Sequence, residues 1–265
     1  EDTWDRSNAP TLLNDFLDHA KAYAPSADLV VWPEGALPFY LDQAPGYLSE
    51  LRRIAKKNES TIITGMPTRA GNRRFNSIVS IGQTSQTYNK QKLVPFGEFV
   101  PLEASLRGVI DFFDLPMSNF SKGDASQLPL STSVGSLAPF ICYEIVYPDF
   151  VAKGSRSSNL LITISNDTWF GSSHGPHQHF QMARYRALEL QKQLIRGANN
   201  GITAIIDERG GIVSKLPQFE RATLKDEVIP REGLTPFARF GSTPILLISL
   251  IFSLFIGIKA RRQQG

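Results

Sequence analysis

The sequence has little of several things that would point to particular functions. Its 265 residues include a single cysteine, Cys142, so an internal disulfide and a cysteine-rich metal site are both excluded. The net charge is only +3, and no Lys/Arg-rich stripe interleaved with aromatic residues occurs, so the electrostatic footprint of a nucleic-acid-binding protein is missing. Internal repeats and low-complexity segments are also absent. The remaining composition, 42% hydrophobic and 20% charged, is typical of a globular protein.

One long apolar run breaks this soluble pattern near the C-terminus. Residues 241–258 carry no charge, and as a helix they would span about 27 Å with apolar side chains on every face. The positive charges that follow at Lys259, Arg261 and Arg262 are typical of a helix end in the cytoplasm. We therefore predict a transmembrane helix here. A buried core helix is the alternative, because the run is short for a membrane span.

The sequence suggests one domain followed by a tail. We expect a catalytic-type domain over residues 1–235, the transmembrane helix over 241–258 and a basic cytoplasmic tail over 259–265. The domain would then lie on the outer face of the membrane. The first four residues are acidic and polar, unlike a signal peptide, so we expect another delivery route, as in a fragment of a longer membrane protein.

Strand-like and helix-like segments alternate along the domain, which predicts a layered α/β fold. Helices are predicted over Ala9–Ala22, Tyr47–Lys57 and Gln178–Ile195. Strands are predicted over Ala27–Trp32, Thr61–Gly65, Asn76–Ile81, Thr87–Leu93, Leu137–Cys142, Asn159–Ser165, Gly201–Asp207, Ile212–Lys215 and Ala222–Val228.

Three ionisable residues follow or end predicted strands, namely Glu34, Lys90 and Cys142. Strand ends are where ligands meet an α/β sheet, so these side chains can converge. A carboxylate can take the proton of a thiol, and an ammonium can lower the pKa of the thiol and stabilise an oxyanion. The set therefore suits acyl transfer. Taken singly, the cysteine could equally be a small buried hydrophobe, and the two charged residues could be solvated.

The sequence around these residues resembles a known family. The segments Trp32-Pro33-Glu34, Tyr88-Asn89-Lys90 and Cys142-Tyr143-Glu144 are similar to the Glu-Lys-Cys triad of the nitrilase (carbon–nitrogen hydrolase) superfamily. Three longer segments, residues 92–101, 165–171 and 199–203, resemble the apolipoprotein N-acyltransferases within it. The resemblance covers essentially the whole chain. It implies a nitrilase-like α-β-β-α sandwich with a C-terminal transmembrane helix.

The resemblance also implies roles for individual residues. Glu34 would be the general base, Lys90 the oxyanion stabiliser and Cys142 the nucleophile that accepts the acyl group. Four further positions match residues that the family uses around its triad. Glu98 would orient Lys90 or the incoming amine, and Glu144 would sit at the pocket edge. Tyr143 and Trp169 would be aromatic residues beside the nucleophile. Core packing is the alternative role for the two aromatics.

The implied activity transfers a fatty acyl group from a membrane phospholipid, through a cysteine thioester, to the N-terminal amine of a diacylglyceryl-cysteine apolipoprotein. It requires no cofactor and no metal, and the domain would face the periplasm at the bacterial inner membrane. A membrane-anchored amidase that hydrolyses a small amide is the second hypothesis. A binding domain without catalysis is the third, and the intact Glu-Lys-Cys set argues against it.

Two other segments have open interpretations. The histidines His174, His177 and His179 have no helical pairing before the helix begins and no accompanying thiol or carboxylate, so we interpret them as an exposed helix entry rather than a metal site. The segment Val109–Phe120 has three phenylalanines. It could be a flap that covers an acyl chain or part of the core.

Overall fold

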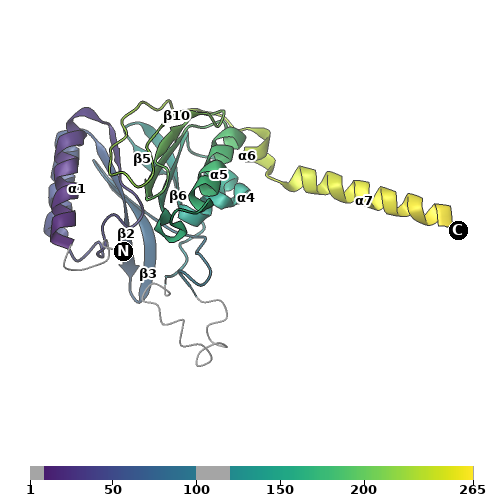
Figure 1. Cartoon of the computed structure of the whole chain (residues 1–265), viewed down its shortest axis with the longest axis horizontal. Helices are drawn as coiled ribbons and strands as arrows, with labels where there is room; N and C mark the ends of the chain where they lie inside the picture. Colours follow the sequence, from purple (N-terminus) through teal and green to yellow (C-terminus); the bar gives the residue numbers. More distant parts are fainter. Residues whose placement is uncertain (1–8, 100–119, 265) are drawn as a thin grey trace, which may run out of the picture.

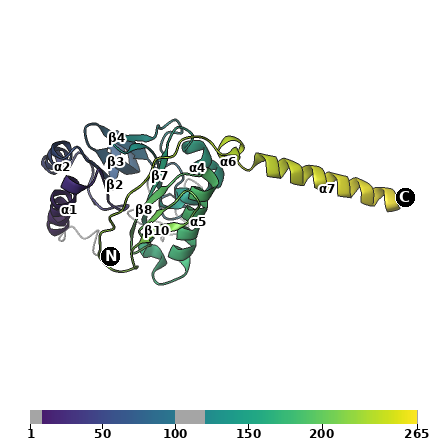
Figure 2. The same cartoon turned by 90° about the horizontal axis from the view of Figure 1, so that it is seen from above.

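The computed structural model describes residues 9–99 and 120–264. Two β-sheets are stacked against each other, and helices cover the outer face of each sheet (Figures 1 and 2). The segment Val109–Phe120, except for its last residue, lies outside the described residues.

The first half of the chain builds the smaller sheet, with strand order β1-β2-β3-β4. Strand β1 pairs with β2 in parallel, and the remaining pairs are antiparallel. The elements are α1 (Ala9–Tyr23), the 3-10 helix η2 (Ala24–Ser26), β1 (Leu29–Val31), α2 (Pro45–Lys57), β2 (Thr61–Ala70), β3 (Arg73–Ile81) and β4 (Ser85–Asn89).

The second half builds a sheet with strand order β10-β9-β8-β7-β6-β5, in which β6, β7 and β8 are parallel neighbours. Its elements are β5 (Leu130–Thr132), β6 (Gly135–Ile141), η4 (Cys142–Val146), α4 (Pro148–Gly154), β7 (Leu160–Asn166), η5 (Asp167–Phe170), α5 (Gly175–Leu190), β8 (Leu194–Asn199), β9 (Ala204–Ile206), β10 (Ile212–Lys215), α6 (Pro236–Phe240) and α7 (Thr243–Gln264).

Strand side chains alternate between two apolar layers, because successive residues of a strand point to opposite faces. In β2, Ile62 packs under α1 and α2, whereas Ile63 packs between the sheets. In β7, Leu160 and Ile162 face the other sheet, whereas Leu161 packs under the helices α4 and α5. Both faces of both sheets are therefore buried, which confirms the predicted α-β-β-α sandwich.

Two predicted elements differ from the structure: one helix is too long and one strand does not form. The predicted helix Gln178–Ile195 ends at Leu190, where Gln191 adopts a left-handed conformation, and Leu194 begins strand β8. The apolar residues of β8 had continued the helical spacing by chance. No strand forms over Ala222–Val228.

The core also extends past residue 235, because Ala238 of α6 packs among the buried residues beneath α4 and α5.

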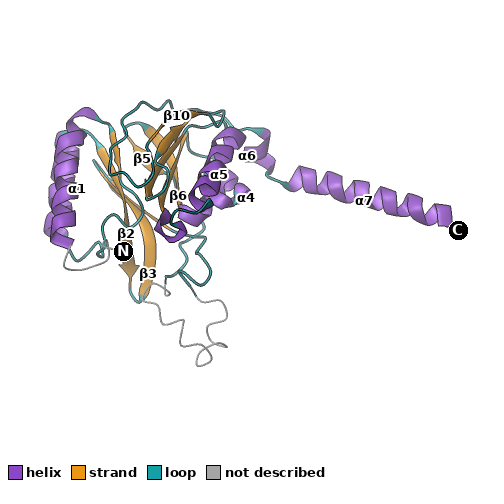
Figure 3. Cartoon of the chain, viewed as in Figure 1, coloured by secondary structure: helices purple, strands orange, loops and turns teal. Residues whose placement is uncertain are grey.

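The predicted C-terminal helix forms as α7 and projects away from the sandwich (Figure 3). Its large apolar side chains are exposed from Ile245 to Ile256, for example 66% at Ile251. Within residues 9–99 and 120–264, no helix is long and apolar enough to cross a membrane. The predicted membrane span at 241–258 is therefore not reproduced, although the helix itself is.

Gly65 of β2 fixes how closely the loop after β1 can approach the sheet. A Cβ at this position would lie 2.6 Å from the Glu34 Cα and 2.7 Å from the Pro33 carbonyl oxygen. Both are backbone atoms, which cannot rotate away. The loop that carries Glu34 can therefore take this position only because residue 65 is a glycine.

We predict that Gly65→Ala destabilises the domain by about 1–3 kcal/mol, because overpacking forces the backbone to move. Thermal unfolding monitored by circular dichroism would measure this. The matched control is Gly46→Ala in α2, where a Cβ meets nothing within 4 Å and stability should be unchanged or slightly increased. Equal melting temperatures for the two variants would contradict the prediction.

Candidate active site

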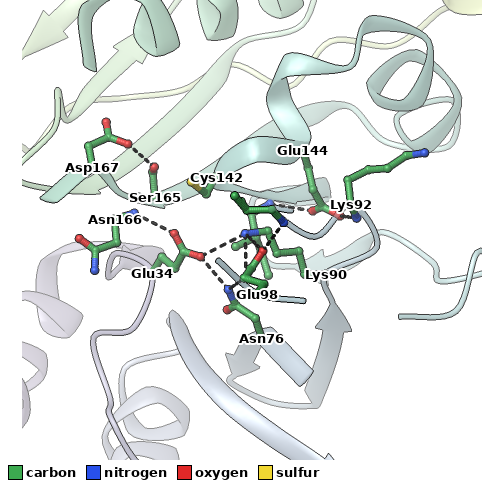
Figure 4. A network of polar contacts seen from close by, with 12 residues as sticks. Glu34, Asn76, Lys90, Lys92, Glu98, Cys142, Glu144, Ser165, Asn166 and Asp167 are labelled. Carbon is green, nitrogen blue, oxygen red and sulfur yellow. Dashed lines mark hydrogen bonds and ion pairs between the residues drawn. The ribbon is translucent and has the colours of Figure 1, made fainter. Parts of the chain in front are cut away.

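The three residues singled out in the sequence come together where strands of both sheets end (Figure 4). Glu34 follows β1, Lys90 follows β4, and Cys142 begins η4 directly after β6. The ends of β7 and β8 reach the same place. The Asn166 backbone N–H donates to Glu34 Oε2 (2.8 Å), and Asn199 Nδ2 donates to the Glu34 carbonyl oxygen (3.0 Å).

Lys90 is almost completely buried, at 1% exposure. Its Nζ lies 2.9 Å from Glu98 Oε2, 3.0 Å from Glu98 Oε1 and 3.5 Å from Glu34 Oε1. Burial alone would lower the pKa of Lys90, but the negative charges of Glu34 and Glu98 and the hydrogen bond to Glu98 outweigh burial and raise it. The ammonium is therefore permanently charged and faces two carboxylates.

Asn76 of β3 bridges the two carboxylates. Its Nδ2 donates to Glu34 Oε1 (2.7 Å) and to Glu98 Oε1 (2.8 Å). Glu98 is held from its other side by the Val94 backbone N–H, 2.8 Å from Oε2. A neutral amide thus supplies a hydrogen to each acid and holds the two carboxylates side by side around one lysine. Sequence reasoning missed Asn76, because a lone asparagine within a strand gives no signal.

Cys142 occupies a sharp strand-to-helix turn. Its φ is +49°, in the left-handed region that residues other than glycine rarely adopt. Its side chain is partly buried and packs against the layer between the sheets. Burial and the charge of Glu34 raise the pKa of the thiol to about 12, while Lys90 and a hydrogen bond from Ser165 act in the opposite direction. In the free protein the thiol therefore keeps its proton at neutral pH.

Glu144 differs from its expected place at the pocket edge, because it is completely buried (0% exposed). Its Oε1 accepts from the backbone N–H groups of Gln91 (2.6 Å) and Lys92 (3.1 Å), and its Oε2 accepts from that of Ile141 (2.8 Å). Tyr88 OH donates to both oxygens at 3.0 Å. Glu144 thus ties the segment after Lys90 to the strand before the nucleophile.

The environment of Glu144 also sets its charge. Burial raises the pKa of its carboxyl to about 7, against the effect of the backbone N–H donors from Ile141, Gln91 and Lys92. The carboxyl of this structural link therefore changes its charge near neutral pH. Because Glu144 is completely buried, it cannot contact an incoming amine from solvent.

The two aromatic positions have different settings. Tyr143 is partly buried and meets Tyr147 edge to face, with ring centroids 5.1 Å apart. Trp169 of η5 is 76% exposed. Core packing is therefore excluded for Trp169, which presents a large apolar surface close to the Asn166 turn that binds Glu34.

A second buried polar cluster lies beside Cys142. His179 is buried, unlike the exposed His174 and His177, so the expected exposed helix entry is wrong for this one residue. Its ring contacts Asp167 Oδ1 (3.0 Å) and the carbonyl oxygen of Cys142 (3.0 Å). Sequence reasoning missed the pairing because 12 residues and a turn separate His179 from its acid.

The thiol of Cys142, the Asp167 carboxylate and the His179 ring place three possible metal ligands within 4.8 Å of one another. Both ring nitrogens of His179 are already engaged, one by the Cys142 carbonyl and the other by Asp167. The Asp167 carboxylate is likewise shared with Arg196 at 2.8 Å. The donor set is therefore committed to internal hydrogen bonds and does not fit a metal centre.

The fold is that of solved carbon–nitrogen hydrolases. A carbon–nitrogen hydrolase from Helicobacter pylori matches 78% of this chain and 79% of its own, with a TM-score of 0.60 at 17% identity. An amidase from Nesterenkonia, solved with an acetamide moiety added covalently at its active-site cysteine, matches 78% of this chain and 80% of its own, with a TM-score of 0.58 at 19% identity. At this identity the likeness concerns the fold alone.

Sequence comparison defines the family. The carbon–nitrogen hydrolase family model matches residues 2–232, and the chain belongs to that family. The apolipoprotein N-acyltransferase of Azotobacter vinelandii is 49% identical over 99% of this chain and 52% of its own length. That of Pseudomonas syringae pv. tomato is 50% identical over 85% of this chain and 46% of its own. The chain thus spans about half the length of these relatives.

We predict that Glu34→Gln speeds alkylation of Cys142 by iodoacetamide at every pH from about 8 to 10. The Glu34 charge raises the pKa of the thiol, so its removal lowers that pKa, and below the pKa each unit gives about tenfold more reactive thiolate. Mass spectrometry of the single-cysteine chain would give the rate.

The matched control for this charge effect is Glu220→Gln, which removes an exposed carboxylate and should leave the alkylation rate unchanged. Slower alkylation of the Glu34→Gln protein would contradict this prediction and would mean that losing Glu34 as a base outweighs removing its charge.

Proposed function

We propose that this chain transfers a fatty acyl group from a membrane phospholipid, through a thioester on Cys142, to the N-terminal amine of a diacylglyceryl-cysteine apolipoprotein. The observation that carries the proposal is the 49% identity with an apolipoprotein N-acyltransferase over 99% of the chain. The convergence of Glu34, Lys90 and Cys142 at the strand ends of the two sheets supports it. We assign these three residues as base, oxyanion stabiliser and nucleophile.

In the first half-reaction, Glu34 takes the proton of the Cys142 thiol as Sγ attacks the ester carbonyl of the phospholipid. A thiol with a pKa of about 12 needs such a base at neutral pH. The oxyanion that forms faces the Lys90 ammonium, which the carboxylates of Glu34 and Glu98 hold in place. The intermediate then expels the lysophospholipid alcohol, which receives the proton from Glu34, and leaves an acyl-thioester.

In the second half-reaction, the amine of the lipoprotein cysteine attacks the thioester carbonyl. Glu34 accepts the proton that the amine loses, and the departing Cys142 thiolate recovers it. The products are an amide and the free thiol. Lys90 stabilises the second oxyanion as it did the first. Glu98 acts by orienting Lys90, since its carboxylate is already occupied by Lys90, Asn76 and Val94.

Contact with the bacterial inner membrane, with the domain on the periplasmic face, belongs to the same proposal. The large apolar side chains of α7 are exposed from Ile245 to Ile256, and a continuous apolar patch of this kind marks an interaction surface. We assign α7 as the segment that holds the domain against lipid, where phospholipid donors and lipidated acceptors are concentrated. Trp169, 76% exposed near the site, suits an interfacial position because its ring is amphipathic.

A membrane-anchored amidase is the second candidate, because a solved amidase shares the fold at 19% identity. The same three residues would form the same thioacyl intermediate, and water would then take the place of the amine. The two reactions are therefore separated by what discharges the intermediate.

We predict that the chain mixed with phospholipid vesicles gains the mass of an acyl group at Cys142 and releases little free fatty acid. Water is excluded from a productive acyltransferase site, so the thioester should persist until an amine arrives. Adding a diacylglyceryl-cysteinyl peptide should discharge it into an N-acyl peptide. Intact-protein and peptide mass spectrometry measure both steps, and Cys142→Ala is the blank for both.

If free fatty acid appears at the same rate with and without the peptide, and no N-acyl peptide forms, the amidase-type reaction is correct instead. Acylation of the Cys142→Ala protein would remove the thioester from the mechanism altogether.

We also predict that the chain floats with phospholipid vesicles in a density gradient and that replacing Ile248, Ile251 and Phe255 with serine reduces the bound fraction severalfold. Each residue is more than half exposed in α7, and burying a side chain of this size in an apolar phase is worth about 1.5–3 kcal/mol.

The control for flotation replaces three exposed apolar residues elsewhere, Leu128, Leu188 and Ile229, with serine and should leave binding unchanged. Equal loss in the two triple variants would indicate non-specific hydrophobic adsorption rather than lipid contact through α7.

A further inference from the structure

The conformation of the nucleophile needs a cause. A left-handed φ of +49° at Cys142 is a strained backbone conformation for a residue with a side chain. Such a conformation persists only when neighbouring bonds fix the backbone on both sides. On the N-terminal side, Glu144 Oε2 accepts from the Ile141 N–H.

On the C-terminal side, the partner is His179. Its Nε2 lies 3.0 Å from the carbonyl oxygen of Cys142. A carbonyl oxygen only accepts hydrogen bonds, so Nε2 carries the hydrogen and donates it. The bond crosses from α5 to the residue that bears the thiol, and it joins a buried ring to a partly buried residue. This buried imidazole takes no part in the triad.

The ring of His179 is itself fixed by a buried ion pair. Its Nδ1 lies 3.0 Å from Asp167 Oδ1 and 3.1 Å from Arg196 NH2. Asp167 pairs with Arg196 at 2.8 Å and accepts from Ser165 Oγ at 2.5 Å. Burial alone would raise the pKa of Asp167, but the bond with His179 and the charge of Arg196 outweigh burial and keep it below its usual value.

We propose that His179 is a positioning residue, whose Nε2–H holds the Cys142 carbonyl and thereby keeps the nucleophile in its left-handed, attack-ready conformation. Asp167 and Arg196 hold the ring at the angle that this bond requires. The inference deepens the proposed function, on which it rests for the identity of Cys142 as nucleophile. An alternative role, in which His179 merely satisfies the buried Asp167–Arg196 pair, predicts a different outcome for two substitutions.

Glutamine and asparagine separate the two roles, because each preserves one half of the histidine. In His179→Gln the amide nitrogen reaches the place of Nε2 and can donate to the Cys142 carbonyl. In His179→Asn the shorter amide reaches the place of Nδ1 and can serve Asp167 but not the carbonyl. His177→Asn, at an exposed position of the same helix, is the control for any change in α5.

The reaction to measure is the first-turnover burst of p-nitrophenolate from p-nitrophenyl butyrate, in which Sγ takes the butyryl group and p-nitrophenolate leaves. We expect a burst rate constant about 30- to 100-fold lower in His179→Asn at unchanged KM, as for a nucleophile displaced by about 1 Å. His179→Gln should restore the rate to within about threefold of wild type. His177→Asn should match wild type.

Rates are compared per folded molecule, with the folded fraction taken from circular dichroism. A burst in His179→Asn at or above that of His179→Gln overturns the proposal, as does a wild-type rate in both. Should the asparagine variant not fold, a folded glutamine variant slowed more than about thirtyfold also overturns it. A wild-type burst with the activated ester but none with phospholipid counts against the proposed donor and leaves the His179 comparison intact.

Discussion

The structure of the site depends on one fully buried ammonium, that of Lys90. A lysine that deep is tolerated only because Glu34 and Glu98 surround it, and removing one partner of a buried pair typically costs about 3–5 kcal/mol. The carboxylates would in turn repel each other without Lys90 and the bridging amide of Asn76. The smaller sheet therefore carries a charge cluster whose members require one another, and this places Glu34 and Lys90 together.

Cys142 comes from the other sheet and is positioned by separate contacts. Glu144 ties the turn before Cys142 to the segment after Lys90, which joins the two halves of the sandwich at the active site. The side chain of Cys142 lies against the apolar layer between the sheets, and burial there keeps the thiol protonated. A thiol of this kind carries little thiolate at neutral pH, and in the proposed mechanism Glu34 removes its proton as the ester is attacked.

The outer surface has a different physical character from the site. The charges of the site are buried and paired, whereas the apolar side chains of α7 stand outside the sandwich and are open to solvent. An isolated apolar helix gains nothing from the core of its own domain. The apolar residues of α7 therefore do not stabilise the fold of the domain. In the proposed function they contact lipid.

The sequence by itself determined the alternation of strands and helices and the strand-end positions of Glu34, Lys90 and Cys142, because strand periodicity and turn residues are local signals. The motif around residues 165–171 also pointed to the site, but the sequence did not show what this segment does there. Tertiary structure alone decided that β8 begins within an apparent helix, that Glu144 is buried, and that Asn76 and His179 contact the site. These outcomes depend on contacts between residues 12 to 56 positions apart in the chain, and burial and hydrogen-bond partners at that range have no local pattern.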